Sequence, residues 1–420
     1  MSNRRARGED SVYFDASRRL WRGQIALPPG PNGRRRAKTV SGHSRSEVVD
    51  KLRTARQDID AGVRLMAREV PLVQDWLRTW LGVAARTCKD STLASYEVDV
   101  NKYAIPSIGA IRLDRLTAED VERLYDQLYD RGLSTSTVSG LHRTLRAAFN
   151  EAVRRSWMVR NPVKNARPRK VTEREIVPLS LEETQRVIEV AKTHRNAARW
   201  TVALALGLRQ GEASGLRWGD VDLDRKTIHV RRALAPLRWQ HGCAPTGGTA
   251  SCGEPSGVKC PQRKGGGLKL VEPKSTAGTR LVSVPESLVA ELASHRIAQA
   301  AERLKVGADW VGPPPGSDEC FVFTNSRGGP IGPKQDWLQW SAILDEAGVD
   351  HRRVHDARHT AATFMLVLGV ESRVVMATMG WSSMAMIQRY QHVVPQLRDE
   401  VAGRMESLLF TPERNRDSGR

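Results

Sequence analysis

Long apolar runs are missing from this 420-residue sequence. It contains no stretch of about 18 apolar residues, the length that a membrane-spanning helix requires. The longest uncharged helical stretch, Trp200–Leu208, has the size of a core helix. The arginines near the N-terminus are followed by no apolar segment, which argues against a secretory signal peptide. We therefore expect a soluble, cytoplasmic protein without a membrane partner.

Cysteine is also scarce, with five residues in the chain. Five cysteines do not make a disulfide framework for a protein of this length. Three of them share the Gly- and Pro-rich insertion 241–267 with a histidine; the four residues are His241, Cys243, Cys252 and Cys260. Three thiols and an imidazole can bind Zn²⁺ tetrahedrally. Because the spacing is not that of a standard zinc knuckle, the sequence leaves structural zinc and a metal-free loop both open, and we predict no cofactor.

Acidic residues are too few to balance the basic ones. The chain has 66 Lys and Arg against 47 Asp and Glu, a formal net charge of +19. Such an excess indicates a polyanionic partner and favours nucleic acid over a membrane surface. Only 14 of the cations are lysines; arginine is suited to phosphate because its planar fork binds two oxygens at once. A GC-rich genome gives the same bias, and both reasons can hold.

Residues 1–65 predict a small β-sheet backed by a helix. Apolar residues alternate on either side of Asn32-Gly33, a pair typical of a hairpin turn. A helix is expected over 44–59, with Ser44 at the N-cap and Glu47 in the capping-box position. A basic sheet of this kind can lie on DNA, and a solvated basic appendage explains the same pattern. The overall fold class is expected to be multi-domain α+β.

Residues 66–160 form an all-α segment in this interpretation. The apolar periodicity and the cap at Thr117 and Asp120 predict helices over 70–85, 91–105, 117–130 and 134–157. Arginines on the last helix are either a DNA-facing stripe or an ordinary solvated face. A basic linker is predicted over 161–178; eight of residues 154–174 are Lys or Arg, so an extended tether would follow a phosphate backbone.

Residues 179–410 predict a mainly α domain with one small antiparallel sheet. Ser180 and Glu183 form a capping box at its start. Helices are expected over 197–208 and 336–346, and strands over 227–234, 268–272, 279–284 and 320–324. An apolar stripe over 396–409 packs either on its own domain or on a neighbouring protomer. Residues 411–420 are expected to be disordered.

Three side chains in the stretch 355–390 carry the chemistry. His355 and Arg358 are three residues apart and share one face of a helix, and Tyr390 follows the next helical segment. An imidazole, a guanidinium and a phenol suit attack of tyrosine on a phosphodiester. Arg209, between two glycines at a helix junction, must meet an anion, which is either Glu212, Asp220 or a phosphate. Lys274 lies in a turn, where lysines are usually solvated.

Four segments, 207–223, 273–280, 355–362 and 379–393, together resemble the tyrosine recombinases of the phage integrase family in order and spacing. The resemblance implies that Arg209 and Arg358 bind the phosphate. His355 is then a general base or hydrogen-bond partner, Lys274 the general acid and Tyr390 the nucleophile. Trp381 stands where most members have a second histidine; its indole N–H can donate a hydrogen bond but cannot titrate.

The resemblance also implies how the protein acts. Residues 1–65 would be an arm-type DNA-binding domain, 66–160 a core-binding domain and 179–410 the catalytic domain. The protein would integrate phage or mobile-element DNA through a 3′-phosphotyrosine, as a homotetramer on double-stranded attachment sites, at the bacterial nucleoid. The phosphotyrosine ester would keep the bond energy, so rejoining would need no ATP; consistently, the sequence has no G-x-x-x-x-G-K loop. An excision directionality factor and a DNA-bending host protein are expected partners. A type IB topoisomerase-like enzyme and a non-catalytic DNA-binding regulator are the alternatives.

Overall fold

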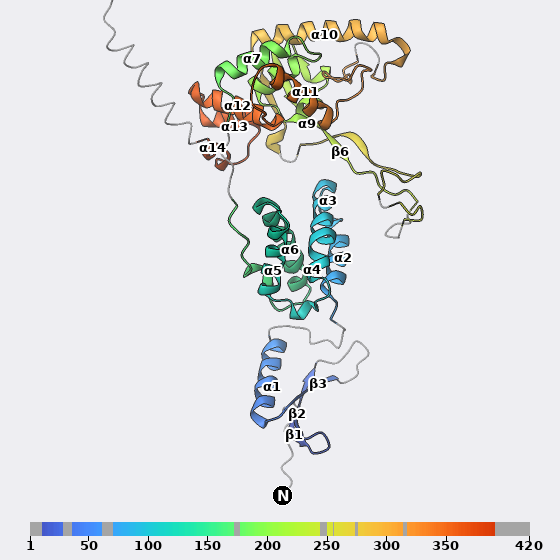
Figure 1. Cartoon of the computed structure of the whole chain (residues 1–420), viewed down its shortest axis with the longest axis vertical. Coiled ribbons are helices and arrows are strands. Elements are labelled where there is room, and N and C mark those ends of the chain that lie inside the picture. The colour runs from blue at the N-terminus through green and yellow to red at the C-terminus, as the bar shows by residue number, and fades with distance from the viewer. Residues whose placement is uncertain are drawn as a thin grey trace, which may run out of the picture. The chain divides into compact units, whose positions relative to one another are not determined.

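The computed structural model divides into two compact units, residues 1–173 and 174–420 (Figure 1). It describes residues 11–27, 36–60, 70–171, 177–243, 250–254, 256–273, 276–313 and 317–390. The predicted helix over 396–409 and the predicted tail 411–420 lie outside these ranges, as does Lys274. No helix within the described ranges is both long and apolar enough to cross a membrane.

The first described elements are a three-stranded antiparallel sheet, β1 (Ser11–Asp15), β2 (Leu20–Leu27) and β3 (Arg36–Gly42), followed by α1 (Arg45–Asp60). The predicted pairing of the hairpin is confirmed, because β2 and β3 pair in register from Trp21↔Gly42 to Leu27↔Arg36. Its Asn32-Gly33 tip lies outside the described residues. The predicted cap is also confirmed, since the Glu47 N–H donates to Ser44 Oγ over 3.1 Å.

The four helices predicted over residues 70–157 are confirmed as α2 (Val73–Ala84), α3 (Asp90–Val98) with α4 (Ile105–Ile108), α5 (Ala118–Asp130) and α6 (Thr135–Arg154). A π-helical segment over 99–104 joins α3 to α4, just before Pro106, which has no N–H to donate. The predicted capping box of Thr117 and Asp120 is present at the start of α5. These helices share one hydrophobic core that includes Trp76, Leu77, Tyr125, Leu141 and Phe149.

Within its described residues, the second unit contains two small sheets rather than the single one predicted. One has the order β4 (Val221–Asp222), β5 (Thr227–Val230), β8 (Arg280–Ser283); the other pairs β6 (Ala233–Leu237) with β7 (Gly267–Val271). The strand predicted over 227–234 is therefore broken. Arg231 and Arg232 lie at the break, and both form ion pairs with the buried Asp220. These ion pairs hold the chain out of the first sheet before β6 begins.

The helices of the second unit are α7 (Leu181–Ala191), α8 (Ala198–Thr201), α9 (Gln210–Ser214), α10 (Glu286–Val306), α11 (Pro333–Glu346), α12 (Val354–Val367), α13 (Ser372–Met379) and α14 (Ala385–Gln388). The capping box predicted at Ser180 and Glu183 is confirmed. The helix predicted over 197–208 is found as α8 and a π-helical segment over 202–206. α10 was not predicted. Trp200 and Trp340 stack with ring centroids 5.2 Å apart inside one core.

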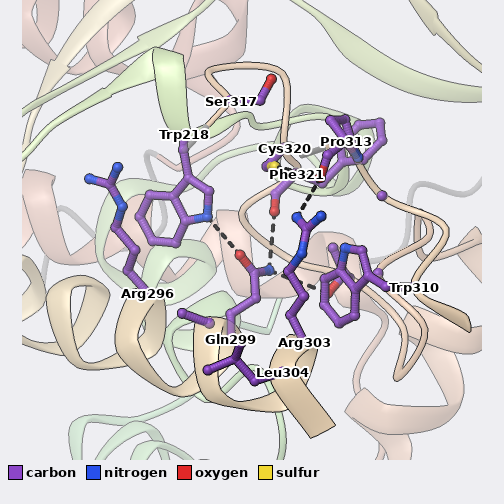
Figure 2. A pocket seen from close by; sticks show the side chains of 14 residues that line it. Trp218, Arg296, Gln299, Arg303, Leu304, Trp310, Pro313, Ser317, Cys320 and Phe321 are labelled. Atoms are coloured by element: carbon purple, nitrogen blue, oxygen red, sulfur yellow. Dashed lines mark hydrogen bonds between the residues drawn. The ribbon is translucent and has the colours of Figure 1, made fainter. Parts of the chain in front are cut away.

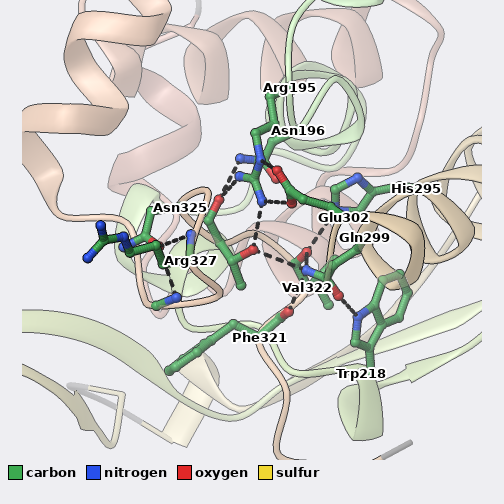
Figure 3. Close-up of polar contacts among 12 residues, drawn as sticks. Arg195, Asn196, Trp218, His295, Gln299, Glu302, Phe321, Val322, Asn325 and Arg327 are labelled. Carbon is green, nitrogen blue, oxygen red and sulfur yellow. Dashed lines mark hydrogen bonds and ion pairs between the residues drawn. The ribbon is translucent and has the colours of Figure 1, made fainter. Parts of the chain in front are cut away.

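The strand predicted over 320–324 is wrong, because backbone pairing is limited to isolated bridges and side chains bind the carbonyl groups of Phe321, Val322 and Thr324 (Figure 3). Gln299 Nε2 donates to the carbonyls of Phe321 and Val322 over 3.2 and 3.0 Å. Asn196 Nδ2 donates to the Thr324 carbonyl over 3.0 Å. Only isolated bridges, Arg217↔Phe321 and Thr324↔Pro330, form within the described part of this segment. These side chains fasten the segment to α10 and to the start of α8.

Candidate active site

Arg358 is the buried centre of the site. It lies on α12 with 2% of its surface exposed, and its guanidinium donates to the carbonyls of Gly207 and Met379. Burial, and then the nearby Arg209, lower the pKa of Arg358 to about 9. Gly207 has a left-handed φ of +63°, and a Cβ there would meet Met379 Cε at 2.6 Å. Glycine is therefore required where the chain turns toward Arg209.

Arg209 lies at the start of α9 with 40% of its side chain exposed. Its Nη1 donates to Glu212 Oε1 over 2.6 Å, and its Nη2 donates to the Gly380 carbonyl over 3.2 Å. Of the two carboxylates predicted as its partner, the structure selects Glu212. Because the side chain keeps this exposure while it is paired, the ion pair does not exclude contact with a phosphate.

Glu212 joins Arg209 to a further arginine that the sequence did not single out. The carboxylate is 4% exposed and accepts from Arg280 Nη2 over 2.8 Å, while Arg280 Nε donates to the Thr378 carbonyl over 2.6 Å. Burial alone would raise the pKa of Glu212, but the hydrogen bonds and charge of Arg280, together with those of Arg209, outweigh it and the pKa is lowered. A buried anion thus ties α9, β8 and the end of α13 together.

Replacing Glu212 with glutamine is expected to destabilise the second unit. The change leaves Arg280, whose side chain is 6% exposed, as a buried cation without a counter-ion, which costs about 3–5 kcal/mol. We expect the melting temperature to fall by roughly 6–20 °C. Because the folded-state pKa is lowered, this stabilisation is present above the ordinary pKa of glutamate and is lost as the pH falls through the folded value.

Differential scanning calorimetry on the full chain measures this effect. The matched control is Glu319→Gln, because Glu319 is 71% exposed and lies 3.7 Å from Arg217. Exposed pairs of this kind contribute about 0–1 kcal/mol. Equal melting temperatures for the two variants would show that Glu212 is not an essential counter-ion.

Tyr390 is buried, with 2% of its surface exposed, and follows α14. Its hydroxyl is hydrogen-bonded to His359 Nδ1, and its ring stacks on Trp381 with centroids 5.6 Å apart. Burial raises the pKa of Tyr390 to about 12, against the opposing effect of Arg358. The phenol is therefore protonated at neutral pH and needs a proton acceptor before it can attack.

His359 is such an acceptor, and the sequence interpretation missed it. Burial, followed by the neighbouring His355, lowers its pKa to about 4, so the ring is neutral at pH 7. Nδ1 can then accept the hydroxyl hydrogen of Tyr390. His359 directly follows Arg358 and lies four residues after His355 on the same helix. This position beside His355 and Arg358 was the signal that the sequence offered, but nothing in the sequence shows that Tyr390 folds back onto His359.

His355 lies at the exposed edge of the site. Its ring meets that of His359 edge-on, with centroids 5.0 Å apart and an interplanar angle of 89°. Desolvation of the ring lowers the pKa of His355, and the nearby positive charge of Arg358 lowers it further. The structure thus gathers five of the six predicted residues around Tyr390: Arg209, His355, Arg358, Trp381 and Tyr390 itself. The sixth, Lys274, lies between β7 and β8 in the sequence and outside the described residues.

Two other features lie apart from this site. A pocket of about 290 Å³ lies between α10 and the loop after it, lined by Trp218, Arg296, Gln299, Arg303, Trp310 and Phe321 (Figure 2). It contains none of the candidate catalytic residues.

The second feature is the group His241, Cys243, Cys252 and Cys260, whose ligand atoms all lie within 4.8 Å of one another, close enough to hold a metal ion.

Comparisons with known protein families and sequences find recombinases. The profile of the Phage integrase family matches residues 286–396, and that of the Phage integrase SAM-like domain matches residues 79–169. An integrase of Saccharopolyspora erythraea is 38% identical over 97% of this chain and 98% of its own. A XerC-like tyrosine recombinase of Caldanaerobacter subterraneus subsp. tengcongensis is 28% identical over 95% of this chain and 98% of its own.

Comparisons with solved structures find the same fold. The integrase of the Tn1549 transposon, bound to transposon right-end DNA, has a TM-score of 0.60 and 20% identity, and the match covers 80% of this chain and 99% of that one. A lambda integrase tetramer bound to a Holliday junction has a TM-score of 0.52 and 14% identity, over 90% of this chain and 94% of that one.

Proposed function

This chain belongs to the phage integrase family of tyrosine site-specific recombinases, and on that basis we propose that Tyr390 is its nucleophile. Tyr390 attacks a DNA phosphodiester and forms a 3′-phosphotyrosine, which a second DNA end later reverses. The observation that carries the proposal is the contact of the Tyr390 hydroxyl with His359 Nδ1, close enough to the buried guanidinium of Arg358 to feel its charge. A nucleophile, its proton acceptor and a phosphate-binding cation occupy one small site.

Each residue has a separate part in the proposed reaction. When DNA binds, Arg358 releases the carbonyls of Gly207 and Met379, and Arg209 releases that of Gly380. Both guanidiniums then bind the non-bridging oxygens of the phosphate, where negative charge develops. As Tyr390 attacks, its proton passes to His359.

The remaining groups serve the phosphate and the leaving group. Lys274 protonates the departing 5′-oxygen. His355, at the exposed edge of the site, donates a hydrogen bond to the phosphate. Trp381 holds the Tyr390 ring by stacking and offers its N–H to the phosphate. The phosphotyrosine keeps the bond energy, so strand joining needs no ATP.

Trapping the covalent complex tests the proposal. Full-length protein is incubated with nicked DNA that carries the element's candidate crossover site, so that the cleaved end diffuses away and cannot be rejoined. A complex that survives a denaturing gel, with the DNA attached to the peptide containing Tyr390, supports the proposal. Tight binding to that DNA without any cleavage would leave a DNA-binding regulator. Relaxation of supercoiled DNA of any sequence would instead indicate a topoisomerase.

Lys274→Ala and His359→Phe are expected to differ on DNA with sulfur at the 5′-bridging position. On ordinary DNA both variants should cleave about 10²–10⁴ times more slowly. A thiol has a pKa of ~8.5, so a thiolate leaves without a proton and Lys274→Ala should regain most of its rate. His359→Phe should not, because His359 acts on the attacking oxygen. Single-turnover cleavage measures both rates; rescue of both variants, or of neither, contradicts the assignment.

The proposal extends to assembly and domain roles. Residues 1–65 bind arm-type sites, 66–160 bind the crossover core, 161–178 link the core-binding domain to the catalytic domain, and 179–410 catalyse. Four copies act on two duplexes at the attachment sites, in the cytoplasm of a bacterial host at its nucleoid, with a directionality factor and a DNA-bending protein. Support comes from the net charge of +19 and from the similar fold of a lambda integrase tetramer bound to a Holliday junction.

A further inference from the structure

The β6–β7 hairpin continues well past its paired strands. Beyond the ladder, Gln240 and Lys264 exchange two backbone hydrogen bonds of 2.9 and 3.0 Å, which keep the two chains together as they enter the tip. Figure 1 shows this hairpin extending away from the helical body of its unit. The four residues His241, Cys243, Cys252 and Cys260 lie immediately beyond the Gln240–Lys264 pair.

We propose that His241, Cys243, Cys252 and Cys260 bind one structural Zn²⁺ ion. Their ligand atoms all lie within 4.8 Å of one another, and two of the separations match those of a tetrahedral site. With Zn–S bonds of about 2.3 Å, two sulfurs on one zinc lie about 3.8 Å apart. Cys260 Sγ and Cys243 Sγ are 3.6 Å apart, and Cys252 Sγ lies 3.3 Å from His241 Nδ1. The four side chains are therefore already placed around a common centre.

The tip needs such an ion because it has little else to hold it. Cys260 is 2% exposed, yet it belongs to none of the five hydrophobic clusters in the described parts of the chain. The backbone is nevertheless tightly folded. A Cβ at Gly242 would clash with the Gln262 carbonyl oxygen, and one at Gly257 would clash with that of Trp239. Zinc supplies the folding free energy where an apolar core is lacking.

A disulfide accounts for these residues less well. The five cysteines all lie in the described part of the chain, and none is joined in a disulfide. A bond between Cys243 and Cys260 would need a sulfur separation of about 2.05 Å, far shorter than the 3.6 Å found. Such a bond would also involve neither Cys252 nor His241, although both belong to the same cluster. Zinc uses all four groups.

The ion would fix the direction of a basic arm. Residues 231–271 contain seven Lys and Arg and one acidic residue. The base of the hairpin packs on α9: a Cβ at Gly211 would meet Leu234 O at 2.8 Å, and one at Gly215 would meet Leu234 N at 2.7 Å. Because α9 begins directly after Arg209, the arm starts beside the proposed phosphate site. The polyanionic backbone of DNA is the partner that this charge fits.

Metal analysis of the full-length protein tests the proposal. Protein purified under reducing conditions without chelator should carry about one zinc per chain by mass spectrometry of the metal. Cys252→Ser and His241→Ala should lose most of it, whereas Cys88→Ser and Cys320→Ser, outside the cluster, should keep it. His241→Cys should also keep it, because four thiolates form a standard zinc site. This rescue separates loss of a ligand from misfolding.

Two further readouts make the result decisive. Co²⁺ added to the metal-free protein should give the visible bands of a tetrahedral thiolate site, and these should be absent in Cys252→Ser. After denaturation with chelator, five thiols per chain should react. A wild-type protein that holds no zinc and gives no cobalt spectrum would overturn the proposal, as would equal zinc in wild type and Cys252→Ser or a count of three thiols.

The proposed contact of the hairpin arm with DNA rests on the proposed function and is tested separately. Removing the zinc should make the dependence of DNA affinity on salt shallower, by about 0.9 in the slope of log K against log salt for each phosphate that the arm no longer binds. An unchanged slope in the metal-free protein would overturn the role of the hairpin on DNA. The zinc measurement does not depend on DNA.

Discussion

Replacing Tyr390 with phenylalanine is expected to abolish the covalent complex with DNA. The change removes only the hydroxyl oxygen that attacks phosphorus, and loss of a nucleophile lowers the rate roughly 10⁶-fold. DNA affinity should stay nearly constant, because the hydroxyl is buried against His359 while a large excess of cations supplies the affinity. Covalent trapping on nicked DNA and a gel-shift titration under the same conditions measure the two quantities.

The chain offers a matched control for this variant. Tyr125 is also buried, and its hydroxyl lies 2.9 Å from His142 Nδ1. Tyr125→Phe therefore removes the same kind of buried hydroxyl–imidazole contact, but from the helical core of the other unit. It should leave cleavage unchanged. A covalent complex that persists in Tyr390→Phe, or one that disappears equally in Tyr125→Phe, would contradict the assignment of the nucleophile.

Replacing Arg358 with alanine is expected to slow cleavage by about 10³- to 10⁵-fold, the range for arginines that neutralise charge on a reacting phosphoryl group. DNA affinity should fall far less, since Arg358 is one phosphate-binding cation among many. The variant should also be less stable, because the buried carbonyls of Gly207 and Met379 lose their donor, at about 1–3 kcal/mol for each unsatisfied group. The cleavage rate must therefore be measured well below the melting temperature.

Two further variants isolate the catalytic effect of Arg358. Arg225→Ala makes the same substitution at a side chain that is 85% exposed and 3.8 Å from Asp222, and should leave both rate and stability near wild type. Arg358→Lys keeps the charge but loses the two-pronged geometry, so its rate should lie between wild type and alanine. A full cleavage rate in folded Arg358→Ala would refute its role in the reaction.

Features specified by neighbouring residues were predictable from the sequence. The caps at Thr117 and Ser180 need only a partner three residues ahead, and both are present. α10 was missed because its apolar residues do not form one stripe: Ile297 and Leu304 are 72% and 83% exposed. The split into two sheets depends on Asp220 binding Arg231 and Arg232, contacts that apolar alternation does not reveal.

The candidate site was predictable in part of its membership but not in its connections. The spacing of His355 and Arg358, together with the four family-like segments, singled out most of the residues that the structure brings together, but not His359. Glu212 was considered only as a partner of Arg209, whereas its closest buried partner, Arg280, is 68 residues away. His359 lies 31 residues from the hydroxyl that it holds. Such pairs arise only when the chain folds, so local patterns cannot reveal them.

The internal bonds of Arg358 have a consequence for fidelity. Its guanidinium is bonded to two backbone carbonyls and Tyr390 is almost wholly buried, so neither of these two proposed catalytic groups is free to meet a phosphate in this conformation. DNA must supply enough binding free energy to release both groups before any strand can break. A duplex that binds poorly does not supply this free energy and dissociates without being cleaved. Each insertion site is thus selected twice, once by the affinity of the complex and again by its ability to open the enzyme.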